Sequence, residues 1–230
     1  MNSNMLLDAE LNYFRSGYSV IAGIDEAGRG SFAGPLTVAL AVFSRDFINS
    51  TVPSELKGLD DSKKLSASVR KRLIFSIKEK TRASSVVHIP NRTVDKIGIN
   101  VATETAVIRA VEKTIAKGCV PDIVLIDGNY RFPTLQKRFP GMRFESVVGG
   151  DGKIFSIAAA SILAKVTRDD RMVRYGRHFP DYMFEKHKGY GTQLHRQKIQ
   201  EFGPCVLHRR TYLKNMIDQG LINSPVRHPY

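Results

Sequence analysis

A short apolar run that leads into two acidic residues and a glycine-rich turn constrains this chain most. Val20-Ile21-Ala22 is followed at once by Gly23-Ile24-Asp25-Glu26-Ala27-Gly28-Arg29-Gly30. Two adjacent carboxylates at the end of a strand can hold a divalent metal ion, and glycines let a backbone approach a phosphate or a sugar closely. The segment therefore predicts metal-assisted chemistry on a ligand that carries phosphate.

Two further acids lie at the edges of other predicted elements. Asp127 follows the apolar strand 123–126, and Asp151 precedes a long alanine-rich helix. Because open α/β sheets bind ligands at strand ends, the separate acids can serve one metal site. Two ions about 4 Å apart can activate a water and stabilise the leaving oxygen of a phosphodiester. Taken singly, Asp127 is also typical of a turn and Asp151 of a helix N-cap.

The neighbouring acids Asp25 and Glu26 leave one geometric question open. Successive residues of a strand point to opposite faces of the sheet, so their spacing does not show that both side chains converge. Glu26 can then act through its main-chain oxygen or from a bend in the strand.

Strand-like and helix-like segments alternate along the chain, which predicts an α/β fold with an antiparallel start and a helical C-terminal part. The predicted strands are 18–25, 36–43, 84–89, 123–126 and 143–148. The predicted helices are 1–17, 66–81, 100–117, 153–176, 192–202 and 211–218, with Ser66 as the cap of the second.

Charge and composition narrow the class of protein. The net charge is +13, for which nucleic acid is the leading partner and a merely soluble basic protein is the alternative. No apolar stretch approaches the roughly 20 residues of a membrane span, and the N-terminus lacks a secretory pattern. Cys119 and Cys205 have no metal-ligand spacing, which favours reduced thiols and a cytoplasmic protein.

With these residues in view, the chain resembles bacterial ribonuclease HII, the type 2 ribonuclease H. Motifs in family order cover nearly its whole length. They are Gly-Ile-Asp-Glu-Ala-Gly-Arg-Gly at 23–30, Ala-Gly-Pro at 33–35, Asp-Ser-Lys-Lys-Leu at 61–65, Ile-Asp-Gly-Asn at 126–129, Gly-Gly-Asp at 149–151, Ala-Ala-Ala-Ser-Ile-Leu-Ala-Lys-Val-Thr-Arg-Asp at 158–169, Lys-His-Lys-Gly-Tyr-Gly-Thr at 186–192 and His-Arg-Arg at 208–210.

The resemblance implies one catalytic domain over 1–230. Its fold would be ribonuclease H-like, a mixed sheet flanked by helices, with about 180–230 as a helical C-terminal extension that binds substrate. Implied partners are RNA–DNA hybrids and duplex DNA that contains ribonucleotides. The implied activity cuts the RNA strand, nicks 5′ of single embedded ribonucleotides and leaves 3′-hydroxyl and 5′-phosphate ends. Water rather than the ribose 2′-OH would be the nucleophile. Ribonucleotide removal from DNA and RNA primer removal are the implied roles.

The resemblance also assigns residues. Asp25, Glu26, Asp127 and Asp151 would be catalytic and would hold Mg²⁺ or Mn²⁺, with two ions during catalysis. Gly28, Arg29 and Gly30 would contact the ribose 2′-OH through the backbone, and Tyr190 would stack on the following deoxyribose. Ser62, Lys63, Lys64 and Lys165 are further candidates for contact with substrate. The 2′-OH is what distinguishes RNA from DNA at such a site.

Several residues carry weaker expectations. Arg168, Asp169 and their neighbours suggest an exposed helix with ordinary ion pairs. His187 and His208 favour a structural or substrate-contact role over acid catalysis. Lys186, Lys188, Arg196 and Lys198 flank Tyr190 and suggest a strip that binds the nucleic-acid backbone. Ser31-Phe32 stands where family members often carry proline and a smaller apolar residue.

Two other readings compete with the endonuclease. A non-catalytic binder of hybrids would not need four acids beside a phosphate, so the acids argue for catalysis. Ribonuclease HIII typically carries an extra N-terminal domain, for which the residues before Gly23 leave no room. Nothing in the motifs requires more than a monomer.

Overall fold

The structure, a computed structural model, describes residues 3–50, 56, 59 and 66–222. The strands are β1 (Ile21–Ala27), β2 (Leu36–Val42), β3 (Ala83–Ile89), β4 (Ile123–Asp127) and β5 (Arg143–Val147). The α-helices are α1 (Ser3–Arg15), α2 (Arg45–Ile48), α3 (Ala67–Lys80), α4 (Asn91–Ile97), α5 (Ile99–Ile115), α6 (Leu135–Arg138), α7 (Phe155–His178), α8 (Phe184–His187), α9 (Gln193–Phe202) and α10 (Lys214–Asp218). Short 3₁₀ turns are η3 (Gly150–Gly152), η4 (Pro180–Tyr182) and η5 (Arg210–Tyr212).

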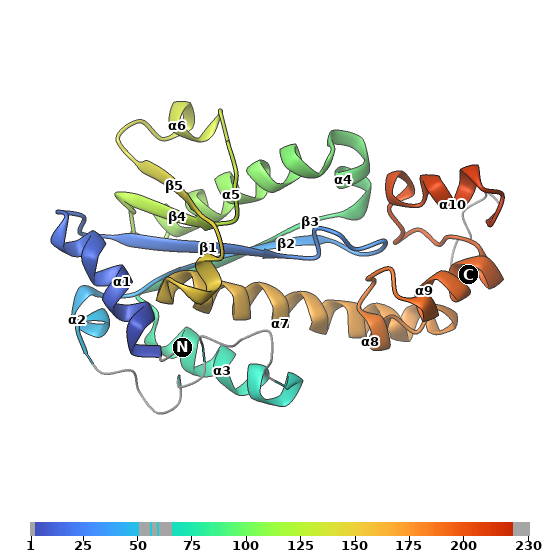
Figure 1. Cartoon of the computed structure of the whole chain (residues 1–230), viewed down its shortest axis with the longest axis horizontal. Helices are drawn as coiled ribbons and strands as arrows, with labels where there is room; N and C mark the ends of the chain where they lie inside the picture. Colours follow the sequence, from blue (N-terminus) through green and yellow to red (C-terminus); the bar gives the residue numbers. More distant parts are fainter. Residues whose placement is uncertain (1–2, 51–55, 57–58, 60–65, 223–230) are drawn as a thin grey trace. The chain divides into compact units, whose positions relative to one another are not determined.

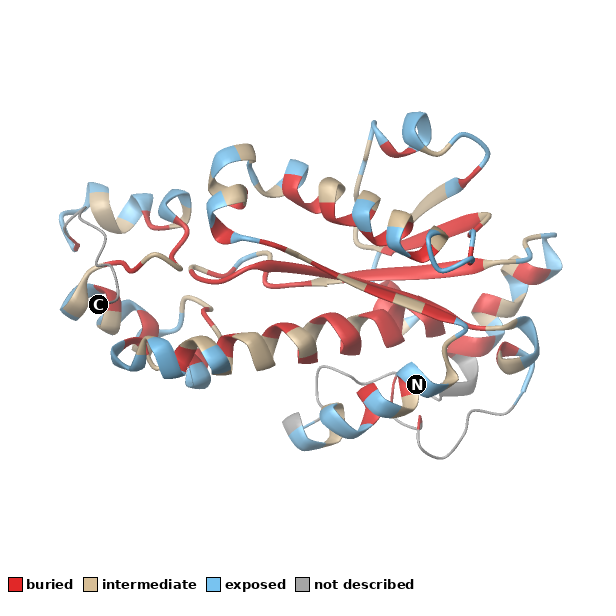
Figure 2. Ribbon diagram, turned by 180° about the vertical axis from the view of Figure 1, so that it is seen from behind, coloured by how far each residue is buried: buried red, intermediate tan, exposed pale blue. Residues whose placement is uncertain are grey.

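The strands form one mixed sheet in the order β3-β2-β1-β4-β5. β1 pairs in parallel with β4, and β4 pairs in parallel with β5. The inner strand β4 is a short, almost purely apolar run, as expected for a parallel strand covered on both faces. Figure 2 shows β1 and β2 coloured as buried over most of their length, whereas the edge strand β5 has no buried residue.

The chain divides into two compact units. Within the described residues, unit 1 is drawn from Met1–Ala27, Val38–Val87 and Glu104–Val166, and unit 2 from Gly28–Thr37, His88–Thr103 and Thr167–Tyr230. The assignment of the chain to one catalytic domain with a C-terminal extension stays a prediction.

The core of unit 1 lies between the sheet and three helices. α1, α3 and the first half of α7 cover one face of the sheet, and α5 lies on the other (Figure 1). Apolar side chains from all three helices join those of β1, β2 and β4 in one buried cluster. The side chain of Ser66 accepts the Val69 N–H at 3.3 Å and so caps α3, as the sequence predicts.

Gly23 is where β1 and α7 approach most closely. A Cβ at this position would lie 2.3 Å from the Ile157 nitrogen and 2.3 Å from the Ser156 carbonyl carbon. No side chain fits in that space, so this glycine lets the first turn of α7 pack directly on the strand. Gly23 thereby sets the distance between β1 and the segment that carries Asp151.

Unit 2 has two small cores of its own. One joins Ala33, Met172, Tyr182, Phe184 and Cys205, and the other joins Ile199, Leu213 and Ile222. The N-terminal cap of α9 is Thr192, whose side chain accepts the His195 N–H at 3.3 Å.

Most predicted elements are confirmed. β1 continues through Ala27, so Asp25 and Glu26 lie inside the strand, because a central strand is held extended by partners on both sides. The helices α2, α4, α6 and α8 were not predicted; α4 begins directly after Pro90, and proline is well tolerated at the start of a helix. Cys119 and Cys205 are buried and unpaired. Across the described part of the chain, no helix combines the length and the apolar character that crossing a membrane requires.

Candidate active site

Two of the predicted metal-binding acids lie on neighbouring strands. Ile24 of β1 pairs with Ile126 of β4, and the next residues are Asp25 and Asp127. Because the two strands run in parallel, their carboxylates are at the same edge of the sheet. Asp25 is 7% exposed, whereas Asp127 is half-buried.

Asp25 lies in an environment that opposes its negative charge. Burial raises the pKa of Asp25 to about 8, and the negative charges of Glu26 and Asp127 add to the effect. Hydrogen bonds from Ser161 and from the Glu26 N–H, at 2.7 Å, partly offset these causes. A bound cation would relieve the repulsion that this carboxyl experiences.

The side chain of Asp127 holds the turn that carries Asp151. Asp127 Oδ1 accepts the Gly150 N–H at 2.7 Å, and Asp151 is the next residue. Gly149 adopts a left-handed conformation with φ of +66°, which lets the chain turn directly after β5. Asp127 therefore stabilises a turn, as aspartate often does, and this turn carries another of the proposed metal ligands. Asp151 is buried within this turn.

Glu26 has a partner that the sequence analysis missed. The Tyr130 hydroxyl donates to Glu26 Oε1 at 2.6 Å, and the Tyr130 ring stacks on Phe132 with centroids 4.9 Å apart. The Glu26 side chain is thus oriented by Tyr130. Only the position of Tyr130 three residues after Asp127 could have pointed to it.

The four acids are compatible with a hard divalent cation. All offer carboxylate oxygens, and the buried Asp25 beside two other carboxylates fits a positive charge. As the described side chains stand, no three acids, histidines or cysteines are grouped as ligands of one ion. In this structure Glu26 Oε1 accepts the Tyr130 hydroxyl and Asp127 Oδ1 accepts the Gly150 N–H, and these contacts orient the two carboxylates.

The glycine-rich loop lies in unit 2 and approaches a buried arginine. A Cβ on Gly28, whose φ is +85°, would lie 1.9 Å from Arg168 Nε. Gly30 is exposed, and a Cβ there would meet nothing within 4 Å. The Arg29 guanidinium donates to Thr103 Oγ1 at 3.0 Å and to Asn100. The side chain of Arg29 is therefore bound within unit 2.

The structure brings Tyr190 to this loop. Tyr190 forms an antiparallel bridge with Ser31, and the Arg168 guanidinium lies 5.1 Å from the centre of its ring. Unit 2 therefore collects the glycine-rich loop and Tyr190, while unit 1 collects Asp25, Glu26, Asp127 and Asp151.

The prediction of an exposed Arg168 was wrong. Arg168 is fully buried, and its guanidinium donates to the carbonyls of Ala33, Pro35 and Lys188 at 2.9–3.1 Å. It was misread because charged neighbours on a helix suggest a solvated face, whereas backbone carbonyls from distant segments satisfy this cation. Burial lowers the pKa of Arg168.

Arg209 is a second buried arginine that was overlooked. It donates to the Gly34 carbonyl at 3.0 Å and to the Arg29 carbonyl at 2.8 Å, and the Tyr212 hydroxyl shares the latter acceptor. Burial lowers the pKa of Arg209 to about 10. The two arginines anchor the backbone on both sides of Gly30.

The remaining predicted residues fall into three groups. Ser62, Lys63 and Lys64 lie outside the described residues. Lys165 and Asp169 are half-buried on α7. His187 and His208 are buried and hydrogen-bonded, which favours the structural role.

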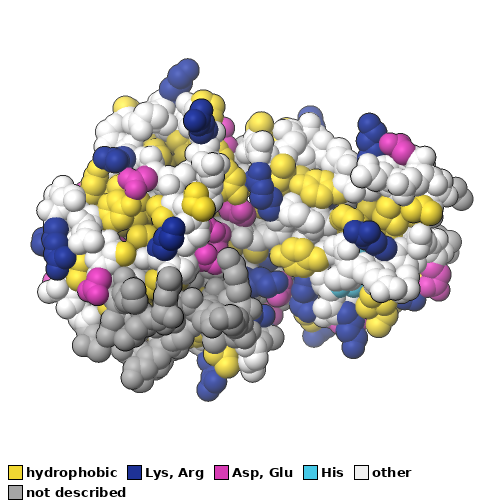
Figure 3. All heavy atoms as spheres, in the orientation of Figure 1, with side chains coloured by type: hydrophobic (Ala, Val, Ile, Leu, Met, Phe, Trp, Pro, Cys, Tyr) yellow, Lys and Arg dark blue, Asp and Glu magenta, His cyan; other side chains and the backbone are white. Residues whose placement is uncertain are grey.

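Lys and Arg side chains are widely distributed over the visible face of the molecule (Figure 3). Near Tyr190, Lys186 and Arg196 are exposed, whereas Lys188 and Lys198 are half-buried.

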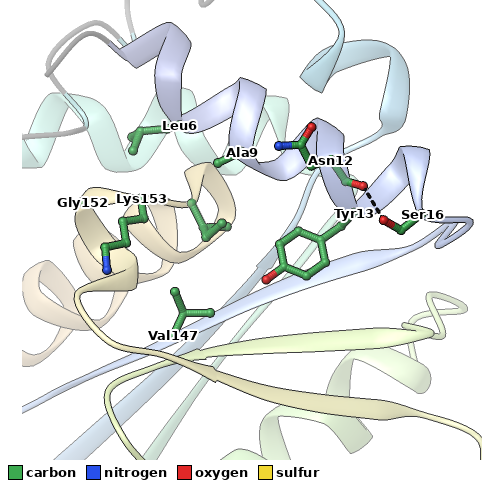
Figure 4. Close-up of a pocket in the computed structure, with 9 residues that line it drawn as sticks. Leu6, Ala9, Asn12, Tyr13, Ser16, Val147, Gly152 and Lys153 are labelled. Atoms are coloured by element: carbon green, nitrogen blue, oxygen red, sulfur yellow. Dashed lines mark hydrogen bonds between the residues drawn. The ribbon is translucent and has the colours of Figure 1, made fainter.

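An apolar hollow of about 580 Å³ lies on unit 1, away from the acid side chains. Figure 4 shows Leu6, Ala9 and Tyr13 of α1 facing Val147 and Lys153. Gly152, the neighbour of Asp151, also lines it, but none of the four acids does. Its apolar lining does not suit a phosphate ligand.

Comparison with known proteins agrees with these features. The sequence model of the family described as ribonuclease HII matches residues 22–215. Ribonuclease HII of Caldicellulosiruptor saccharolyticus is 42% identical over 210 residues, which is 91% of this chain and 95% of that protein.

Solved structures share the fold. Ribonuclease H2 from Pyrococcus horikoshii superposes with a TM-score of 0.72 at 22% identity, covering 87% of this chain and 98% of that one. Bst-RNase HIII in complex with Mn²⁺ superposes with a TM-score of 0.62 at 19% identity, covering 89% and 68%. The extent and identity of the sequence match show that this chain, a ribonuclease H hydrolase, belongs to the ribonuclease HII family.

Proposed function

We propose that this protein is a metal-dependent endonuclease that cuts the RNA strand of RNA–DNA hybrids and nicks duplex DNA 5′ of single ribonucleotides. The observation that carries the proposal is the buried Asp25 beside the carboxylates of Glu26 and Asp127. Family membership supports the general activity. The proposed products carry 3′-hydroxyl and 5′-phosphate ends. The proposed roles are ribonucleotide removal from DNA and removal of RNA primers.

The acids would hold Mg²⁺ or Mn²⁺, two ions during catalysis. Bound ions of this kind lower the pKa of water and neutralise charge on a leaving oxygen. Asp25, Glu26, Asp127 and Asp151 would then bind and orient the ions, and an ion at Glu26 Oε1 would compete with the Tyr130 hydroxyl for that oxygen. The similar fold of an Mn²⁺ complex supports this assignment.

The glycine-rich loop of unit 2, residues 28–30, would contact the ribose of the substrate. The exposed Gly30 offers backbone without a side chain in the way, and Arg168 and Arg209 hold that backbone in place. We assign Gly28, Arg29 and Gly30 to the ribose 2′-OH and Tyr190 to the deoxyribose that follows. Lys165, Ser62, Lys63 and Lys64 are assigned to the phosphate backbone. We also assign the protein to the cytoplasm. We expect it to be a monomer, which gel filtration can check.

The test is cleavage of a DNA duplex that carries one ribonucleotide, with Mg²⁺, with Mn²⁺ and with a chelator. We expect a metal-dependent nick 5′ of the ribonucleotide. Asp127→Asn should abolish cleavage while duplex binding survives, and Asp8→Asn, an exposed acid of α1, is the matched control. Full activity of Asp127→Asn would refute the role of this acid. Duplex binding without any cleavage by the unaltered protein would favour the non-catalytic binder.

A further inference from the structure

Three buried histidines form a connected cluster in unit 2. The rings of His187 and His195 stack with centroids 4.0 Å apart and 16° between their planes. His195 Nε2 lies 3.1 Å from His208 Nε2, and the Phe184 ring packs against all three imidazoles. None of these three histidines takes part in the proposed cleavage reaction.

The hydrogen bonds of His195 and His208 permit one neutral arrangement. His195 Nδ1 lies 3.0 Å from the Tyr190 carbonyl, which can only accept, so this nitrogen carries the proton. His195 Nε2 must then accept, and the donor is His208 Nε2–H. His208 Nδ1 is left to accept the Cys205 N–H at 2.9 Å; the Cys205 carbonyl, at 3.3 Å, is the more distant neighbour.

The same reasoning applies to His187. Its Nε2 donates to the Tyr182 carbonyl at 2.8 Å, and its Nδ1 accepts the Gly189 N–H at 3.1 Å. Burial lowers the pKa of His195 to about 3 and that of His208 to about 4, and the pKa of His187 is lowered as well. All three rings are therefore neutral at pH 7.

Both backbone polar groups of Tyr190 are hydrogen-bonded, and one of them is bound by an imidazole ring. The Tyr190 N–H donates to the His187 carbonyl at 3.0 Å, and the Tyr190 carbonyl accepts from His195 and from the Thr192 N–H. A continuous series of hydrogen bonds runs from the Cys205 N–H through His208 and His195 to the Tyr190 carbonyl. We call this series the histidine relay.

The relay also joins the two segments that flank residues 31–34. On one side Ala33 N–H donates to the Gly189 carbonyl at 3.2 Å. On the other, Gly34 N–H donates to the Leu207 carbonyl at 2.9 Å. The histidine relay links the segment that contains Gly189 and Tyr190 to the segment that contains Cys205 and Leu207. Both segments are hydrogen-bonded to residues 33 and 34, which follow the glycine-rich loop.

We propose that His195 and His208 are positioning residues that set the orientation of Tyr190 and thereby its discrimination of the sugar next to a ribonucleotide. The proposal rests on the proposed function of Tyr190. The histidines exchange no proton with substrate. Their tautomers hold the Tyr190 carbonyl in place, and this fixes the backbone from which the Tyr190 ring extends.

A pair of substitutions at His195 separates positioning from packing. In His195→Asn the side-chain amide lies near the former Nδ1 and still reaches the Tyr190 carbonyl. In His195→Gln the amide reaches instead toward His208 and leaves that carbonyl without the imidazole donor. Both variants lose the same stacked ring, so a thermal melt should show similar losses of stability.

The readout is kcat/KM on a single-ribonucleotide duplex divided by kcat/KM on a continuous RNA–DNA hybrid. We expect His195→Gln to lower this ratio about tenfold, the effect we also expect of Tyr190→Ala, because small displacements of a positioned group have such effects. We expect His195→Asn to stay within about threefold of the unaltered protein. Equal ratios for the two variants would overturn the proposal.

A second measurement does not depend on cleavage. Nitrogen-15 NMR of the histidine rings should show protons on His195 Nδ1, His208 Nε2 and His187 Nε2 at pH 7. The Tyr190 ring signals should shift in His195→Gln and remain in His195→Asn. A different tautomer, or unmoved ring signals in His195→Gln, would refute the relay. Absence of cleavage by the unaltered protein, with these signals as expected, would refute the proposed function alone.

Discussion

At the scale of single residues, Tyr130 controls the state of one proposed ligand. Its hydroxyl donates to Glu26 Oε1 at 2.6 Å, so a metal ion that binds this oxygen competes with the hydroxyl. A net hydrogen bond of this kind contributes about 1 kcal/mol, which is roughly a fivefold change in an equilibrium constant.

Tyr130→Phe should therefore tighten Mn²⁺ binding about fivefold, because Glu26 no longer has a competing donor. Titration calorimetry of the protein without substrate measures this directly. Tyr13→Phe is the matched control, since Tyr13 makes a similar 2.7 Å bond to Glu145, which is not one of the four acids. Weaker or unchanged Mn²⁺ binding in Tyr130→Phe would show that the hydroxyl does not compete with the metal.

The buried carboxyl of Glu10 should make the stability of the protein depend on pH. It is fully buried, Oε2 accepts the Ser156 N–H at 2.8 Å, and desolvation raises its pKa from 4.5 to about 7. The folded state thus holds a proton here that the unfolded state releases above pH 4.5. The associated stability is complete below pH 4.5 and is lost as the pH rises through about 7.

Glu10→Gln should therefore become more stable relative to the unaltered protein as pH rises, by about 3 kcal/mol between pH 4.5 and pH 8. Urea unfolding at a series of pH values gives the difference in free energy. Glu79→Gln, an exposed acid of α3, should show no such trend. A constant difference for Glu10→Gln across this range would contradict the shifted pKa.

At the scale of elements, the contact of β1 with α7 organises the acid cluster. β1 carries Asp25 and Glu26, and the turn before α7 carries Asp151. Gly23 permits the contact because any side chain there would overlap the backbone of Ser156 and Ile157. The glycine that begins the first motif is thus explained by packing rather than by ligand contact.

Gly23→Ala should destabilise unit 1 by about 3 kcal/mol, since the helix backbone cannot yield as a flexible side chain would. Denaturant unfolding measures the loss. Gly152→Ala is the control, because a Cβ there meets nothing within 4 Å, and its effect should be within about 0.5 kcal/mol. Equal stability of the two variants would mean that α7 can move away from β1 at little cost.

At the scale of the whole molecule, charge should govern association with nucleic acid. The net charge is +13, and Lys and Arg side chains are spread over the face shown in Figure 3. Binding a duplex releases counterions in proportion to the phosphates contacted.

For about four phosphate contacts, affinity for a non-cleavable duplex should fall about a hundredfold between 50 and 200 mM salt. Fluorescence anisotropy with a chelator present measures binding without cleavage. A salt-independent affinity would show that the basic surface does not contact phosphates. The same measurement on Asp127→Asn should give the same slope.

Much of the fold was predictable because its signals are local. The apolar runs predicted all five strands, and the three- and four-residue spacing of alanines and valines predicted α5. The acids were singled out because each follows a recognisable apolar strand or glycine turn, and their role stays a prediction. Arg168, Tyr130 and the connection between His195 and His208 were not, since their partners are distant in the sequence.

The sequence by itself determined the α/β class and the family, because apolar periodicity and ordered motifs are properties of the chain that need no contacts. Only the tertiary structure decided which polar groups are buried and what satisfies them. Arg168 is stable inside the protein because three carbonyls converge on it. The histidines are neutral because burial disfavours their charged form, and each ring nitrogen has a matching donor or acceptor. Such partners arise when segments far apart in the chain fold together, so no local pattern records them.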